Sequence, residues 1–369
     1  MWRQPVINSA SILMSLTLVC VCALVAGCTS TVFTPDTCPS EYTAAVVWTS
    51  RTDSASAIQF FSDDDLIAEI PINVQEVGWT DDAPIHHDGK IGFLSIGNGW
   101  LKDGRLVTMS LATCQITLTK IDEPLINIAS SSDGFLTVGN LNGSSYIHKF
   151  FDDGTKPVTA SFESEYITAI QATDDYVFAL SDNVVLNSVA LLVIRSSDLS
   201  EVDRVSLPMM ATGETSSSMT YSAGKLIIPM PVHEDKEARQ LIIIDQNDLS
   251  VHTLQLDAPS PFYVRSVGDT VYVAHTFMNS GFRDLSQYNR ISVVNMADET
   301  STTHELPASV SRFDVNPTTL AVLGPPTDDG TAVLHTYTLP NFDPLVSIKL
   351  KAPSSVPNPF AATLFLPQP

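Results

Sequence analysis

The chain has 369 residues and a formal net charge of −22, and 44% of its residues are hydrophobic against 16% that are charged. This balance is typical of a folded chain with a sizeable core and excludes a disordered one. Because phosphate binding depends on clustered Lys and Arg, 19 basic residues against 41 acidic ones also exclude nucleic acid as a partner. The acidity is better explained by solubility outside the cell than by a specific cation site.

The first 27 residues have the three parts of an export signal. Arg3 precedes an apolar run over residues 12–25, and the small residues Ala26 and Gly27 follow it. The stretch Leu24-Val25-Ala26-Gly27-Cys28 resembles the bacterial lipobox. That resemblance implies cleavage before Cys28 and attachment of lipid, including fatty acids such as palmitate, to Cys28. An uncleaved transmembrane helix is the alternative, since residues 6–27 are almost long enough to span a bilayer.

Residues 28–42 are rich in Thr, Ser and Pro, and we interpret them as a lipidated tether in front of one domain over residues 43–369. Cys20 and Cys22 lie in the signal, so Cys38 and Cys114 are the cysteines of the mature body. Two thiols in an exported chain predict one disulfide. Two unpaired buried cysteines are the alternative.

From residue 43 onward, short runs of Val, Ile, Leu, Phe, Tyr and Thr alternate with turns rich in Asp, Gly, Asn or Ser, which predicts an all-β protein. Runs that fit a third strand recur at spacings of 49, 39, 44, 51, 50 and 42 residues. A period near 46 residues with four strands per unit indicates a seven-bladed β-propeller with four-stranded antiparallel blades. The predicted third strands begin near Ala57, Leu106, Ser145, Val189, Gln240, Arg290 and Ala332.

The sixth repeat shows the pattern most clearly, with expected strands at 262–267, 270–276, 290–296 and 302–306. Its segments Thr270-Val-Tyr-Val-Ala-His and Asn289-Arg-Ile-Ser-Val-Val-Asn-Met-Ala-Asp resemble the paired strands of the YVTN-type propeller repeat of bacterial surface proteins. The resemblance extends loosely over residues 43–366 and implies a fold rather than an activity.

The first repeat offers only three strands, at 44–49, 57–62 and 66–72, and lacks the innermost one. Residues 360–366, at the other end of the chain, can supply it. We therefore expect the C-terminal strand to close the ring within the first blade, so that no sheet edge is left open there.

Turns between first and second strands are expected to be tight, as at Asp88-Gly89 and Gly268-Asp269, whereas loops between second and third strands are longer, as at 97–105, 181–188, 232–239 and 276–289. The tether should join the tight-turn side, so that the long loops point away from the membrane. Loops on a rigid scaffold often carry binding residues. The candidate contact residues are His233, Glu234, Phe277, Phe282, Arg283 and Tyr288, and solvated loops whose aromatics cap the blades are the alternative.

No metal, cofactor or catalytic motif is complete in this sequence. The adjacent His86 and His87 point to opposite faces of a strand, so they do not suit one metal ion. Alignment of the inner strands places Gln171, Thr220, Arg265 and Asp314 at one level of the central channel, where they form a candidate polar ring or simply face water.

These observations favour a binding or scaffold module over an enzyme. We expect a protein of the bacterial cell envelope, anchored to a membrane through lipid, facing outside the cytoplasm and contacting an extracellular protein or glycan. An envelope hydrolase of the lactonase type, with its site in the channel, is the alternative, because the fold alone does not choose between them.

Overall fold

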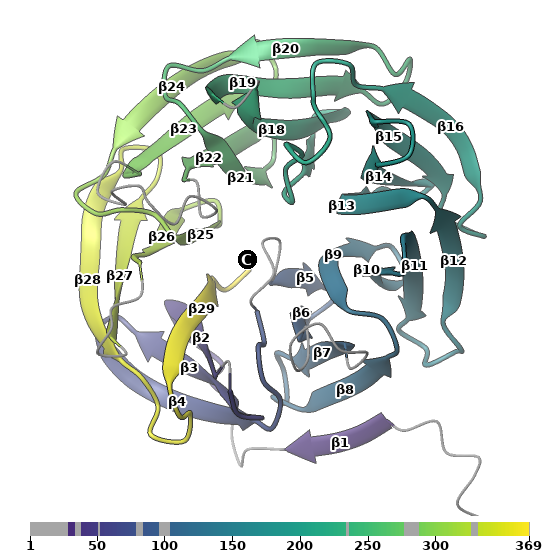
Figure 1. The fold of residues 1–369 in the computed structure, drawn as a ribbon. Helices are drawn as coiled ribbons and strands as arrows, with labels where there is room; N and C mark the ends of the chain where they lie inside the picture. Colours follow the sequence, from purple (N-terminus) through teal and green to yellow (C-terminus); the bar gives the residue numbers. More distant parts are fainter. Residues whose placement is uncertain are drawn as a thin grey trace, which may run out of the picture.

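The computed structural model describes residues 29–33, 38–50, 52–78, 84–95, 104–233, 236–276, 288–325 and 331–368. Their strands form seven antiparallel sheets arranged around one axis (Figure 1). The predicted fold, an all-β propeller of seven four-stranded blades, is confirmed. In the described residues, no helix is long and apolar enough to cross a membrane.

From the axis outward, blades one to three contain β29 (Pro359–Phe365), β2 (Ala44–Ser50), β3 (Ser56–Ser62) and β4 (Asp65–Ile72); β5 (Ile85–His87), β6 (Lys90–Ser95), β7 (Gly104–Ser110) and β8 (Ile116–Ile121); and β9 (Leu125–Ser131), β10 (Gly134–Leu141), β11 (Ser144–Phe151) and β12 (Val158–Glu163). Blades four and five contain β13 (Glu165–Ala172), β14 (Tyr176–Asn183), β15 (Ser188–Arg195) and β16 (Glu201–Ser206); and β17 (Thr220–Ser222), β18 (Lys225–His233), β19 (Lys236–Asp245) and β20 (Val251–Gln255). Blades six and seven contain β21 (Pro261–Val267), β22 (Thr270–His275), β23 (Arg290–Asn295) and β24 (Thr300–Glu305); and β25 (Arg312–Val315), β26 (Thr319–Leu323), β27 (Thr331–Thr338) and β28 (Asp343–Lys351).

The two ends of the domain meet in blade one. β29 pairs antiparallel with β2, from Ala45 opposite Phe365 to Ser50 opposite Pro359. The predicted closure by a C-terminal strand is therefore confirmed. It joins residues more than 300 positions apart, and it leaves β2 paired on both sides.

Blade five departs from the expected strand boundaries. The predicted loop at 232–239 is mostly strand, because β18 and β19 stay paired as far as His233 opposite Lys236. A bulge between Met230 and Val232 lets β18 continue past its prolines, which cannot donate ladder hydrogen bonds. In the other six blades the third strand begins within two residues of the predicted position.

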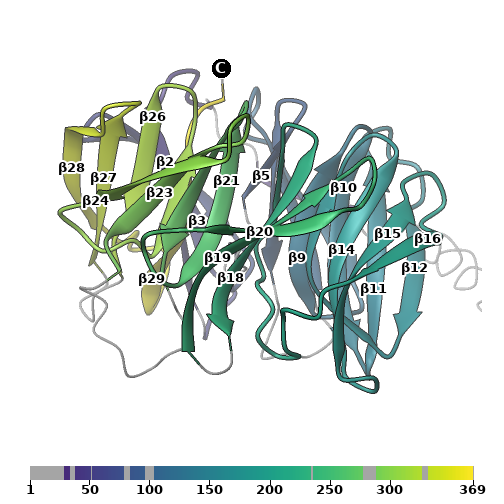
Figure 2. The same cartoon turned by 90° about the horizontal axis from the view of Figure 1, so that it is seen from above.

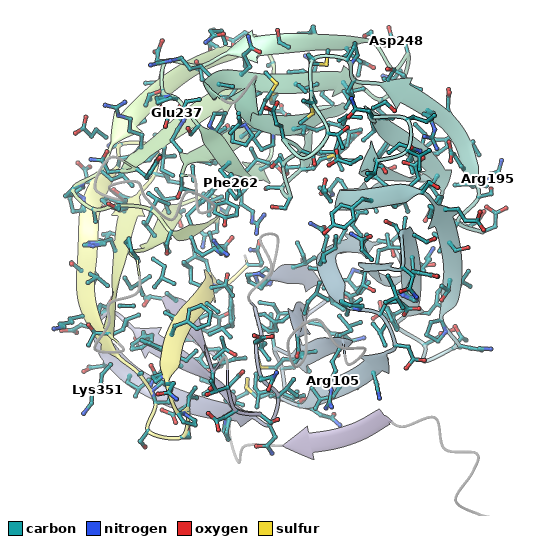
Figure 3. The ribbon with its side chains drawn as sticks, viewed as in Figure 1. Arg105, Arg195, Glu237, Asp248, Phe262 and Lys351 are labelled. Atoms are coloured by element: carbon teal, nitrogen blue, oxygen red, sulfur yellow. A yellow bond between two sulfur atoms is a disulfide. The ribbon has the colours of Figure 1, made fainter. Side chains whose placement is uncertain are left out.

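The ring has two different faces. The short-turn face, as we name it, carries the turns from first to second strand and from third to outer strand. The long-loop face carries the loops from second to third strand and the crossings between blades. Figure 2 shows the ring from the side, with the β18–β19 hairpin reaching the lower edge, the long-loop face, and the C-terminus at the upper edge. Charged residues such as Arg195, Asp248 and Lys351 lie on the outside of the ring (Figure 3).

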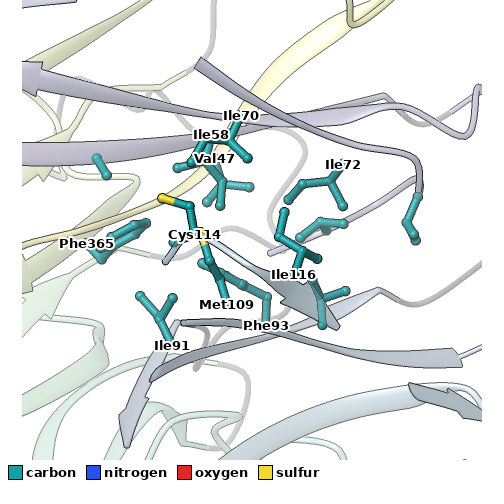
Figure 4. Packing of buried hydrophobic residues seen from close by; sticks show 14 of the residues in the cluster. Val47, Ile58, Ile70, Ile72, Ile91, Phe93, Met109, Cys114, Ile116 and Phe365 are labelled. Carbon is teal, nitrogen blue, oxygen red and sulfur yellow. The ribbon is translucent and has the colours of Figure 1, made fainter. Parts of the chain in front are cut away.

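The core lies between neighbouring blades, where the alternating apolar side chains of facing sheets interdigitate. Between blades one and two, Val47, Ile58 and Ile70 pack on Phe93 and Met109 (Figure 4). Each of these side chains is almost completely buried. Phe365 lies in the same cluster, so the closing strand also takes part in the packing between blades.

The segment in front of the domain is attached to blade two in two ways. Cys38 and Cys114 are joined by a disulfide, with their Cα atoms 5.2 Å apart, as the cysteine count predicts. In addition, residues 29–33 of the expected tether form β1 (Thr29–Phe33), a fifth strand on the outer edge of β8 (Figure 1). An open strand edge offers unpaired backbone groups to such a segment.

The direction of β1 changes the expected orientation of the tether. Cys114 lies in the β7–β8 turn, so the disulfide does hold Cys38 at the short-turn face, as expected. β1, however, runs antiparallel to β8 with Phe33 opposite Ile116 and Thr29 opposite Thr119. Toward its N-terminus the chain therefore runs back along the rim to the long-loop face.

Candidate functional site

The inner strands β29, β5, β9, β13, β17, β21 and β25 surround the ring axis (Figure 1). The four predicted channel residues lie on four of them: Gln171 on β13, Thr220 on β17, Arg265 on β21 and Asp314 on β25. Each lies two or three residues before the turn at the short-turn face. Thr220 and Asp314 are buried, whereas Gln171 and Arg265 are half-buried.

Three of these side chains bond to their own or the next blade. Gln171 Nε2 donates to the Ala172 carbonyl at 3.4 Å, and Arg265 Nη1 donates to the Val264 carbonyl at 3.2 Å. The Thr220 hydroxyl is hydrogen-bonded to the Ser266 hydroxyl at 2.9 Å. These contacts fix the polar groups to the scaffold.

Asp314 has a different role, because its Oδ2 atom accepts the backbone N–H of Leu366 at 2.8 Å. The carboxylate thereby links blade seven to the segment that follows the closing strand. Asp314 also acts electrostatically on two aromatic residues, His86 and Tyr42.

His86, on β5, also lies at this end of the axis, although the alignment of inner strands placed only Gln171, Thr220, Arg265 and Asp314 there. Both of its ring nitrogens are buried without a hydrogen-bond partner. Burial lowers the pKa of its imidazole, the nearby Arg265 guanidinium lowers it further, and Asp314 opposes the change. His86 is therefore a neutral imidazole with both a donor and an acceptor unused.

Tyr42 precedes β2 and, like His86, is subject to the charge of Asp314. Its hydroxyl is also buried without a hydrogen-bond partner, and burial, helped by Asp314, raises its pKa. The Phe365 ring contacts both side chains, with ring centroids 5.9 Å from Tyr42 and 6.0 Å from His86. We define the channel-end cluster as Tyr42, His86, Arg265 and Asp314.

His87 points away from this cluster, as the alternation of side chains along a strand predicts. Its Nε2 atom lies 2.6 Å from Asp152 Oδ2, and its ring packs edge-on against Phe135. The two adjacent histidines thus belong to different environments. Among the described residues, no group of three or more His, Cys, Asp or Glu is placed to hold a metal ion.

The channel-end cluster combines opposite formal charges with two neutral groups that can each donate and accept a hydrogen bond. Such a set suits a small polar molecule that carries both donors and acceptors. The histidine pair could be recognised in the sequence, but the contact that Tyr42 and His86 each make with Phe365 depends on ring closure, which places Phe365 in blade one.

The predicted contact loops fall mainly outside the described residues. This applies to Glu234, Phe277, Phe282 and Arg283, while His233 is the last residue of β18. Tyr288 is described and is only 6% exposed, with its carbonyl accepting the Val310 N–H at 2.8 Å. It therefore belongs to the interior rather than to an exposed contact surface.

Comparisons with known proteins show the fold alone. No protein-family model and no curated protein sequence matches the chain. It is structurally similar to a functionally unknown protein from Desulfotomaculum acetoxidans, at 11% identity and a TM-score of 0.57 over 88% of this chain and 99% of that one. It is also similar to a protein from Lactobacillus plantarum, at 14% identity and a TM-score of 0.53 over 88% and 99% of the two chains. AztD from Citrobacter koseri has 12% identity and a TM-score of 0.50 over 85% and 84%. The class that the fold defines is thus the β-propellers.

Proposed function

We propose that this protein is a lipid-anchored β-propeller that acts as a binding or scaffold module at the bacterial cell surface. Export, cleavage before Cys28 and lipid attachment to Cys28 follow from the signal-like N-terminal segment. The propeller over residues 43–369 then forms the folded body, and the membrane is its first partner through the lipid.

The observation that carries the proposal is the disulfide between Cys38 and Cys114. Disulfides persist in oxidising compartments, which favours a location outside the cytoplasm. The bond also ties the chain ten residues after Cys28 covalently to blade two. A lipid on Cys28 would therefore hold a rigid ring rather than a loosely tethered one.

A rigid ring with polar groups at its axis and loops on one face suits binding. The channel-end cluster is our candidate for a small polar ligand, and the loops that contain Phe277 and Phe282 remain our candidate contact for an extracellular protein or glycan. Because the N-terminal end of β1 points to the long-loop face and Cys28 precedes it, we infer that this contact forms close to the membrane, as in an envelope assembly.

Metabolic labelling with palmitate, followed by crosslinking on intact cells, tests the proposal. The wild-type protein should incorporate label and remain with the membrane fraction, whereas Cys28→Ala should lose both properties. Phe282→Ser should reduce the capture of crosslinked partners, with Ser197→Ala, in an exposed turn of the short-turn face, as the matched control. Equal labelling of wild type and Cys28→Ala would contradict the lipid anchor. Equal capture of partners by Phe282→Ser and Ser197→Ala would contradict the contact site.

A further inference from the structure

Blade four carries three exposed aliphatic side chains at the tip of its β14–β15 hairpin. Val184, Val185 and Leu186 are 68%, 76% and 71% exposed, more than any other large hydrophobic residue among those described. We call these three residues the apolar tip. They connect a second strand to a third, so the tip lies on the long-loop face.

The apolar tip is held in place by the blade beneath it. β14 and β15 remain paired up to Asn183 opposite Ser188. Asn183 Oδ1 accepts the Leu186 N–H at 2.9 Å, and Asn183 Nδ2 donates to the buried Glu165 at 3.0 Å. The exposure of the tip is therefore built into the fold, and a fixed exposed apolar patch marks an interaction site.

Glu165 makes this support strong. It accepts hydrogen bonds from the Ser181 hydroxyl at 2.6 Å and from Arg204 Nη1 at 2.7 Å. Although burial opposes ionisation, these bonds and the one from Asn183 lower the pKa of the Glu165 carboxyl. An ionised, fully bonded carboxylate thus anchors the side chain that shapes the tip.

The chemistry of the tip favours lipid over protein as its partner. Residues 183–194 contain no charged side chain, and the tip contains no aromatic residue. Energetically dominant positions in protein interfaces are enriched in Trp, Tyr and Arg, and Val and Leu are under-represented there. Val and Leu side chains do, however, transfer favourably from water into a bilayer.

The geometry of the tether points to the same partner. β8 runs from the short-turn face to the long-loop face, and β1 runs antiparallel to it. From Phe33 to Thr29, four residues at about 3.3 Å each, the chain moves roughly 13 Å toward the long-loop face. Cys28 precedes Thr29, so a lipid on Cys28 enters the membrane on the side to which the tip projects.

From these observations we propose that the apolar tip of blade four inserts into the surface layer of the membrane that holds the lipid on Cys28, as a second point of contact. This inference rests on the proposed lipid anchor. One weak contact becomes effective when an anchor already holds the protein at the bilayer. Two contacts on blades two and four would fix the tilt of the ring, with the long-loop face turned to the membrane.

Fluorescence quenching by brominated lipid tests this contact. The lipidated protein carrying Val185→Trp is reconstituted into phosphatidylcholine vesicles with and without brominated chains, and the wild-type protein supplies the background from native tryptophans. The matched control is Ser197→Trp, in the exposed β15–β16 turn of the same blade on the opposite face. We expect a blue shift and a loss of the added emission for Val185→Trp and neither for Ser197→Trp.

Equal quenching and equal emission shifts of Val185→Trp and Ser197→Trp in the vesicle-bound protein would overturn the proposal. Vesicle flotation of the same samples reports separately on the anchor, because a protein without lipid on Cys28 stays at the bottom of the gradient. In that case the Cys28 thiol is coupled to a maleimide phospholipid, and the two tryptophan variants are compared again. Quenching of Val185→Trp in the coupled protein would support membrane insertion of the apolar tip while refuting natural lipidation. The absence of quenching in the coupled protein would refute insertion of the tip.

Discussion

The backbone N–H of Leu366 donates a hydrogen bond of 2.8 Å to Oδ2 of Asp314. Leu366 follows the last strand of the domain, in blade one, and Asp314 lies on the inner strand of blade seven. Both residues are buried. The bond therefore crosses the join at which the ring closes, next to a second one in which Asn316 Nδ2 donates to the Pro367 carbonyl at 3.1 Å.

Removing the carboxylate should weaken this join. Asp314→Ala leaves the buried Leu366 N–H without its acceptor, which costs about 1–3 kcal/mol. Urea unfolding should report a lower free energy of unfolding for this variant than for Asp64→Ala, which removes an exposed carboxylate from the β3–β4 turn. If both variants unfold at the same urea concentration, the closure does not depend on Asp314.

The disulfide should contribute more to stability than any single hydrogen bond. Cys38 and Cys114 are 76 positions apart. In the chain-entropy account, closing a loop of this length stabilises the fold by roughly 4–5 kcal/mol. The double variant Cys38→Ser, Cys114→Ser should unfold at a clearly lower temperature in calorimetry. As a control, the wild-type protein unfolded in the presence of reductant should match the double variant, and a persistent difference would show that the serines themselves disturb the core.

Stability should also fall in mild acid, because His275 is buried as a neutral imidazole. Its Nδ1 atom donates to the Pro259 carbonyl at 2.8 Å, so its Nε2 atom accepts from the Ser292 hydroxyl at 2.7 Å. Burial lowers the pKa of His275 to about 4, below the ordinary value of 6.5. The unfolded chain then binds the proton more readily, so the contribution of His275 is complete above pH 6.5 and is lost as the pH falls toward 4.

The pH dependence of the free energy of unfolding between pH 7 and pH 5 measures this effect. His275→Gln should flatten the curve relative to wild type. Some dependence should persist in His275→Gln, because burial lowers the pKa of His148 to about 4 as well. An unchanged slope in His275→Gln would contradict the assignment.

Much of this fold could be predicted from the sequence, because a propeller repeats one local pattern. Alternating apolar residues and turns of Asp and Gly locate the strands, as at Gly268-Asp269, where Gly268 adopts a positive φ of 57°. Closure could be predicted because blade one lacks a strand that residues 360–366 supply. β1 could not, since its pairing depends on the edge of β8 and not on a pattern of its own.

The site was harder to predict than the fold for a physical reason. Gln171, Thr220, Arg265 and Asp314 could be aligned along the chain, but their bonds depend on which neighbouring group each side chain meets. The contact of His86 with Phe365 requires blades one and two to be packed together. The apolar tip lies within the loop predicted at 181–188, but its exposure could not be predicted, because only the hairpin geometry turns these side chains to solvent.

His86 offers a test that separates a role in binding from a role in the fold. Both ring nitrogens lack a hydrogen-bond partner, so His86→Phe removes buried unpaired polar groups while keeping the ring against Phe365. The free energy of unfolding should stay the same or rise by about 1–2 kcal/mol. Calorimetry of His86→Phe and of the matched His87→Phe, which loses the contact with Asp152, provides the comparison. A destabilised His86→Phe would show that the fold itself needs the imidazole. A stable variant that loses ligand or partner capture would instead mean that His86 is kept polar for binding, because a residue that lowers stability persists where function requires it.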